Sequence, residues 1–168
     1  MSERDYQCLL RLSTWAFLNL LAPELTKIIG GKFIPVEGTT VSHLVTTLDQ
    51  LAGIDAWHVK WGQGVRGMAS RIQFIAAGGS AWPTFTIRAW RASGAATELQ
   101  KRREAIADDH IYPYWMTEAY VEGDRLLGFA LARTKDVIEM IERGLCYEQR
   151  MGKDFNDCNC SAVADLRL

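Results

Sequence analysis

Residues 53–76 read GIDAWHVKWGQGVRGMASRIQFIA, and this stretch contains the two clearest strand patterns of the chain. Over residues 68–76, apolar or small side chains alternate with Arg71 and Gln73, as in a strand with one buried face. Residues 53–61 are rich in apolar, aromatic and β-branched side chains, and glycines separate them from the second pattern. The stretch therefore predicts two antiparallel strands joined by a turn.

A third strand pattern, at residues 84–91, follows a Gly-Gly-Ser turn, so we predict that the three strands form an antiparallel meander. A loop through Pro35 and Gly38 precedes them. The other predicted elements are a helix at residues 3–22, a helix that begins at Ser93 or Thr97 and ends near Asp109, strands at 115–121 and 126–133, and a helix at 135–143. This order, α-β-β-β-α-β-β-α, predicts an α+β fold in which helices flank a single mixed sheet of about five strands.

The composition is that of one globular domain, since 48% of the 168 residues are apolar and 23% are charged. We expect a single domain over residues 1–168, with residues 146–168 as a polar tail that is packed on it or partly flexible. The formal net charge of -1 argues against wholesale coating of nucleic acid but allows a local basic patch.

The cysteines and the beginning of the chain bear on location. Cys8, Cys146, Cys158 and Cys160 form no even framework and no zinc-ligand spacing, which favours free thiols in a reducing cytosol. Cys8 and Cys146 are then expected to be buried apolar groups. The charged beginning and the lack of a long apolar run predict a soluble, cytoplasmic protein without a membrane span.

Asp55 is the first candidate for a functional residue. It shares a predicted strand face with Trp57 and Val59, where an unpaired charge is costly unless it is paired, bound to metal or at a strand end. If neighbouring strands present the same face, Asp55, Arg71, Gln73 and Arg88 form one polar cluster. Two alternatives stay open, namely a structural Asp55 with a partner and a solvated face for the arginines.

The order of elements and the sequence Gly53-Ile54-Asp55 resemble the PD-(D/E)xK nuclease superfamily, which has the restriction-endonuclease-like fold, over roughly residues 9–144. The resemblance implies that a strand Asp and an acidic-x-Lys pair on the next strand bind Mg²⁺ or Mn²⁺ and orient water. Asp55 takes the first place, as a catalytic and metal-binding residue. The second falls on Arg71-Ile72-Gln73, so another carboxylate has to complete the site. The candidates for that carboxylate are Glu37, Asp49, Glu98 and Glu118.

Three functions follow as hypotheses. The first is a metal-dependent nuclease that acts on DNA or RNA with Asp55 and Gln73 in its catalytic site. The second is a module that only binds an acidic partner such as nucleic-acid phosphate. Its contact residues are Arg71, Arg88, Arg91, Lys101 and Arg102. The third is a non-enzymatic accessory protein, including a homo-oligomer that associates through exposed aromatic residues. Those aromatic residues are Trp82, Tyr112, Tyr114 and Trp115.

Overall fold

A computed structural model describes residues 3–36, 53–81, 85–150 and 155–160. Its helices are α1 (Glu3–Ala16), the π-helical turn η1 (Phe17–Leu21), α2 (Ala22–Ile29), α4 (Glu98–Ala107) and α5 (Thr134–Glu142). Its strands are β1 (Lys32–Pro35), β2 (Ala56–Lys60), β3 (Gly64–Phe74), β4 (Phe85–Arg91), β5 (Pro113–Glu122), β6 (Arg125–Arg133), β7 (Tyr147–Arg150) and β8 (Phe155–Cys160).

The main sheet has five strands in the order β1-β2-β3-β5-β6. The pairs β1–β2, β2–β3 and β5–β6 are antiparallel, whereas β3 and β5 run parallel. A mixed sheet with flanking helices confirms the predicted α+β class. The parallel pair has a consequence for the chain between β3 and β5. The chain between these two strands has to cross over one face of the sheet, and this crossover contains β4 and α4.

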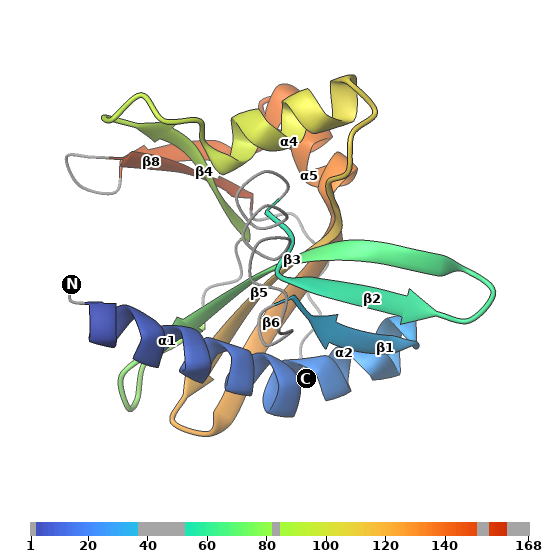
Figure 1. Cartoon of the computed structure of the whole chain (residues 1–168). Coiled ribbons are helices and arrows are strands. Elements are labelled where there is room, and N and C mark those ends of the chain that lie inside the picture. The colour runs from blue at the N-terminus through green and yellow to red at the C-terminus, as the bar shows by residue number, and fades with distance from the viewer. Residues whose placement is uncertain (1–2, 37–52, 82–84, 151–154, 161–168) are drawn as a thin grey trace.

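One face of the sheet is covered by the first helical run, α1–η1–α2 (Figure 1). The run stays continuous through Pro23, which lies in the first turn of α2 directly after the π-helical turn η1. It ends at Gly30, whose φ of 68° favours glycine. Phe17, Leu21 and Leu25 pack against Ala119 and Phe129 of the sheet to form one core. Within the described residues, none of the helices combines the length and apolar composition needed to cross a lipid bilayer.

The opposite side carries α4, α5 and a second sheet with the strand order β4-β8-β7 (Figure 1). A second core joins these elements to the main sheet. Phe85, Ile87 and Leu99 pack there with Met116 and Val137. The alternation of buried and half-buried residues along β4 places its apolar side chains toward this core and Thr86 and Arg88 away from it.

The predicted meander has different members in the structure. Residues 85–91 do not pair with β3 but with β8, so the prediction that they are its third strand is wrong. The third member is β1, at residues 32–35, which we expected to lie in a loop. The predicted loop also included Gly38, which lies outside the described residues. A strand pattern identifies a strand without identifying its partner, and β1 is too short to show an alternation.

The C-terminal segment contains strands that were not predicted. Part of the predicted polar tail, residues 146–168, forms β7 and β8. Cys146 is disulfide-bonded, so the expectation that it is a free thiol is wrong. Cys8 is free as expected but exposed rather than buried. The side chains of Cys158 and Cys160 lie outside those described.

Candidate functional site

Asp55 lies directly before β2, at the point where β2 no longer pairs with β3. The register pairs Ala56 with Met68, so β3 continues beyond the end of β2. The Asp55 backbone N–H donates to the Met68 carbonyl at 2.9 Å, and Asp55 Oδ2 accepts the Ser70 backbone N–H at 2.6 Å. Asp55 therefore terminates the β2–β3 pairing and keeps its carboxylate at the edge of β3, at a strand end, which is one of the three situations in which such a charge is tolerated.

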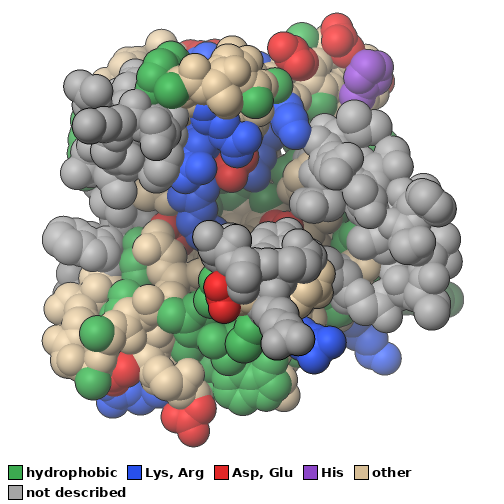
Figure 2. Space-filling model, turned by 60° about the vertical axis from the view of Figure 1, so that its left-hand side comes forward, with side chains coloured by type: hydrophobic (Ala, Val, Ile, Leu, Met, Phe, Trp, Pro, Cys, Tyr) green, Lys and Arg blue, Asp and Glu red, His purple; other side chains and the backbone are tan. Residues whose placement is uncertain are grey.

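A pocket of about 170 Å³ adjoins this edge, between β3, β4, β5 and α4, and we call it the polar pocket. Its charged lining residues are Asp55, Arg71, Glu98, Arg102 and Glu118. Ser70, Thr86 and Thr117 add hydroxyl groups to the lining. Figure 2 shows Lys and Arg side chains gathered around a hollow on this face, with acidic side chains among them. The pocket is therefore suited to a charged, hydrogen-bonding ligand.

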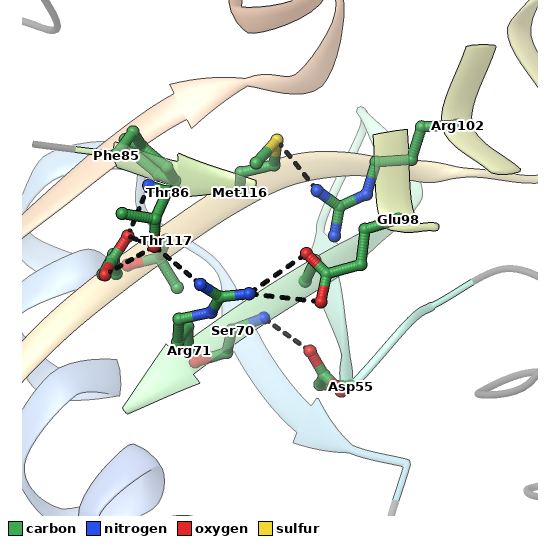
Figure 3. Close-up of a pocket in the computed structure, with 11 residues that line it drawn as sticks. Asp55, Ser70, Arg71, Phe85, Thr86, Glu98, Arg102, Met116 and Thr117 are labelled. Atoms are coloured by element: carbon green, nitrogen blue, oxygen red, sulfur yellow. Dashed lines mark hydrogen bonds and ion pairs between the residues drawn. The ribbon is translucent and has the colours of Figure 1, made fainter. Parts of the chain in front are cut away.

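Glu98, in the first turn of α4, is surrounded by arginines. Nη2 of Arg71 lies 3.2 Å from both Glu98 carboxylate oxygens, and Arg102 lies on the other side of the same carboxylate (Figure 3). Burial raises the pKa of Glu98, but Arg71, Arg102 and Arg88 more than offset it, so the pKa lies below its ordinary value of 4.5. Glu98 is therefore an ionised carboxylate that forms a cluster with the guanidinium groups of Arg71 and Arg102.

Arg102 is the buried member of this cluster, with 7% of its surface exposed. Burial lowers its pKa, and the negative charges of Glu98 and Asp55 act against that effect. Its Nη1 donates to the Met116 sulfur at 3.4 Å. A buried guanidinium remains a cation, so Arg102 brings a permanent positive charge to the wall of the pocket.

Glu118, on β5, is buried and accepts hydrogen bonds from several groups at once. Thr86 donates to it through its backbone N–H at 2.7 Å and through its hydroxyl at 2.8 Å. The Gln73 amide and, at 3.4 Å, the Tyr120 hydroxyl also donate to it. Arg71 in turn donates to the Thr86 hydroxyl at 2.7 Å. This chain links β3, β4 and β5, and it holds the Arg71 guanidinium at the pocket (Figure 3).

The structure brings some of the predicted site residues together and leaves others apart. Asp55, Arg71 and Arg102 line the polar pocket, and Arg88 is close enough to Glu98 to lower its pKa. Gln73, predicted to be catalytic, is instead directed at Glu118 and does not line the pocket. The predicted phosphate-contacting residues Arg91 and Lys101 are half-buried and are also absent from the lining.

The hydroxyl residues of the pocket were not predicted. Ser70 carried a signal, because it is a polar residue on the face of β3 that otherwise carries Met68 and Ile72. Thr86 carried another, because it shares a strand face with Arg88. Thr117 gave no signal that separates it from an ordinary strand threonine.

Among the described residues, the carboxylates near Asp55 that could complete a divalent metal site already have partners of their own. Mg²⁺ and Mn²⁺ take oxygen ligands that face one cavity. Glu98 and Glu118 were candidates to join Asp55, but they are held by Arg71 and by Thr86 with Gln73. In the part of the chain that the structure describes, no three His, Cys, Asp or Glu side chains group as metal ligands. The other candidates, Glu37 and Asp49, lie outside the described residues.

Of the aromatic residues predicted to be exposed, the three that the structure describes are half-buried. The rings of Tyr114 and Trp115 meet edge to face at 4.9 Å, and the Arg66 guanidinium lies 4.4 Å from the Tyr114 ring centroid. Tyr112 is half-buried, with Lys135 at 5.8 Å from its ring centroid. Trp82 lies outside the described residues. Exposed aromatic residues instead include Trp15, Trp61, Trp90 and Tyr147.

Comparison with protein-family models, with curated proteins and with solved structures gave no match. The roles of the site residues are therefore inferred from their contacts in this structure.

Proposed function

We propose that this domain binds the phosphate groups of nucleic acid in the polar pocket. The observation that carries the proposal is that two arginines, Arg71 and Arg102, line the polar pocket beside Glu98. Guanidinium groups bind phosphate oxygens through paired N–H donors, and they keep their charge even when buried. The two arginines of the lining therefore favour a ligand that presents phosphate oxygens to them.

Arg71 is the residue best placed to change partners. Its contact with Glu98 uses one nitrogen at 3.2 Å from each carboxylate oxygen, rather than the two parallel hydrogen bonds of a strong Arg–carboxylate pair. A phosphate that enters the pocket can therefore accept N–H groups from Arg71 without disrupting a strong ion pair. The Thr86 hydroxyl continues to hold the other side of the guanidinium.

Two features support nucleic acid over other anions. Trp90 follows Arg88 on β4 and is 46% exposed, and an exposed tryptophan beside a basic group offers a surface on which a base can stack. The sequence resemblance to the nuclease superfamily also favours nucleic acid, although its three-strand meander is formed by β1, β2 and β3 and not by residues 85–91. A resemblance of this kind is weaker support than the arginines of the pocket.

The proposal is limited to binding. Hydrolysis by the metal-dependent route implied by the resemblance needs a set of oxygen ligands around Asp55, and the described carboxylates are engaged elsewhere. Calorimetric titration of Mn²⁺ into wild type and Asp55→Ala tests this limit. If Mn²⁺ binds to wild type but not to the variant, and wild type cleaves nucleic acid only with Mn²⁺, the protein is a nuclease rather than only a binding module.

The test of binding is fluorescence anisotropy with labelled single-stranded DNA and RNA over a range of salt concentrations. Because phosphate binding releases counterions, the logarithm of the binding constant should fall linearly with the logarithm of the salt concentration. Arg71→Ala should weaken binding and make this slope shallower by roughly 0.7 for each phosphate of a single strand that the variant no longer neutralises. Binding without salt dependence, or none at all, contradicts the proposal.

The matched control is Arg103→Ala. Arg103 is on α4 next to Arg102, but it pairs with Glu142 at 3.5 Å on the surface, away from the polar pocket. Arg103→Ala removes the same charge from the protein as Arg71→Ala does. A general electrostatic effect would therefore weaken binding in both variants equally. The proposal requires a larger decrease in affinity for Arg71→Ala.

A specific observation also favours self-association as a second function. Every third residue from position 9 to 18 of the first helical run is a large apolar side chain that is 40–48% exposed. These residues are Leu9, Leu12, Trp15 and Leu18. Such a row is typical of an interface between proteins. Sedimentation equilibrium should give a mass above that of one chain for wild type and a lower mass for Leu12→Glu. A monomeric wild type at high concentration excludes this function.

A further inference from the structure

A second pocket lies on the other side of Asp55 and Ser70. It measures about 210 Å³, and we call it the apolar pocket. It is formed between the first helical run and β3, with a contribution from β1. The residues that distinguish it are Leu10, Ser13, Thr14, Phe17, Pro35 and Ile72. Asp55 and Ser70 line both pockets, so the two cavities adjoin at these residues.

The two pockets meet because of the way β3 leaves β2. Beyond Met68, β3 has no β2 residue beside it, and Asp55 stands at that edge. Side chains of a strand alternate between its faces, so Arg71 lines the polar pocket and Ile72 lines the apolar pocket. Each cavity alone is smaller than the roughly 300 Å³ at which small-molecule sites begin, but the two together exceed that size.

Ser70 carries an independent sign of a ligand. Its Oγ is buried and has no hydrogen-bond partner among the described residues. A buried hydroxyl normally has a partner, because leaving it without one costs free energy. The Ser70 backbone N–H is bonded to Asp55 Oδ2, and both residues line the junction of the two pockets.

This arrangement matches the order of groups in a nucleotide. The phosphate fits the arginines of the polar pocket, and a base fits an apolar wall that includes the aromatic ring of Phe17. Between them lies a sugar, whose hydroxyls are hydrogen-bond donors. A carboxylate has about four lone-pair positions, so Asp55 can accept such donors while it keeps the Ser70 N–H. A carboxylate beside a sugar is also the way in which other nucleotide sites hold a ribose 2′-hydroxyl.

We propose that the two pockets are halves of one site for a ribonucleotide unit, in which Asp55 and Ser70 bind the ribose hydroxyls. This inference rests on the proposed function, because it assigns the phosphate to the polar pocket. It adds a preference for RNA over DNA, since the 2′-hydroxyl is the group that distinguishes the two sugars. It also assigns the base to the apolar pocket.

The experiment is calorimetric titration with pyrophosphate, with the four ribonucleoside 5′-monophosphates and with their 2′-deoxy counterparts. Pyrophosphate tests the polar pocket alone. At least one ribonucleotide should bind more tightly than pyrophosphate, and about tenfold more tightly than its deoxy form, which is the effect of one good hydrogen bond. Asp55→Asn and Ser70→Ala should each bring the ratio of ribo to deoxy affinity close to one while pyrophosphate still binds.

A variant that fills the apolar pocket tests the place of the base. Ser13→Leu adds volume to the wall of that pocket and should weaken ribonucleotide binding at least tenfold without affecting pyrophosphate. Its control is Gln7→Leu, the same kind of change on the exposed surface of α1. Circular dichroism of each variant shows whether it is folded, and because Ser13 and Ser70 are tested separately, one unfolded variant leaves the other decisive.

The outcomes separate the two proposals. Pyrophosphate binding with equal affinity for ribo and deoxy forms overturns the ribonucleotide site and leaves the proposed function in place. The same holds if Ser13→Leu binds ribonucleotides as wild type does. Absence of binding by both pyrophosphate and the nucleotides overturns both proposals.

Discussion

Glu118 lies where the two sheets meet, and its single carboxylate accepts hydrogen bonds from Thr86, Gln73 and Tyr120. Replacing it by glutamine removes the charge and turns one acceptor into a donor that faces other donors. Glu118→Gln should therefore lower the free energy of unfolding by about 1.5–3 kcal/mol, the range for hydrogen bonds to a charged group. Urea denaturation measures this change. Glu104→Gln, on the exposed surface of α4, is the control and should have a much smaller effect.

Glu98 makes stability depend on pH in a predictable direction. Its pKa in the folded protein is lowered, so its ion pairs stabilise the fold above the ordinary pKa of 4.5. That stabilisation is lost as the pH falls through the lowered pKa. The difference in unfolding free energy between wild type and Glu98→Gln should therefore shrink in acid. Urea denaturation at a series of pH values measures it. A difference that stays constant from neutral to strongly acidic buffer would show that Arg71 and Arg102 do not stabilise the carboxylate.

At the scale of elements, the start of α4 positions the pocket because this helix carries Glu98 and Arg102. Thr97 forms a reciprocal cap in which its hydroxyl accepts the Gln100 N–H and the Gln100 side chain accepts the Thr97 N–H. Thr97→Ala should cost about 1 kcal/mol of unfolding free energy. Ser93→Ala is the matched control, since its hydroxyl makes only an exposed 3.4 Å contact with the Ala95 N–H. Equal destabilisation of the two variants in thermal unfolding would contradict the role of the cap.

Prediction from the sequence succeeded for elements with strong local patterns. The alternation in β3 and the cap before α4 are properties of neighbouring residues, so both elements were found. The pairing of β4 with β8 was missed because a partner strand is chosen by tertiary packing, and FNDCNC in β8 has few of the residues that favour strands.

In the candidate site, too, the sequence predicted features that depend on neighbouring residues and missed those that depend on distant ones. Asp55 and the arginines were identifiable as charged residues in apolar surroundings. The ion pair between Arg71 and Glu98 joins β3 to α4, and no local pattern reveals a contact over that distance in sequence. Gln73 was assigned to catalysis by the position of a motif, whereas the structure directs its side chain to Glu118. Which face of β3 meets β4 had to come from the fold.

At the scale of the whole molecule, the main sheet should be most stable near β5. This strand has β3 and β6 on its two sides, and residues 116–121 are all buried, whereas β1 is a short strand at the sheet edge. In native-state hydrogen exchange, the amides of residues 119–121 should exchange most slowly and those of β1 much faster. Similar rates in the two strands would mean that the sheet opens as one unit.

The parallel pairing of β3 with β5 has a further consequence, for the kinetics of folding. The strands β1, β2 and β3 can pair in sequence, and β5 and β6 form a hairpin, so each group closes only short loops. Joining β3 to β5 requires the chain at residues 75–112 to close as one long loop, and the entropy cost of closure comes before the paired strands stabilise it. The polar pocket is built across this junction. We therefore expect ligand-binding competence to be among the last properties that the folding chain acquires.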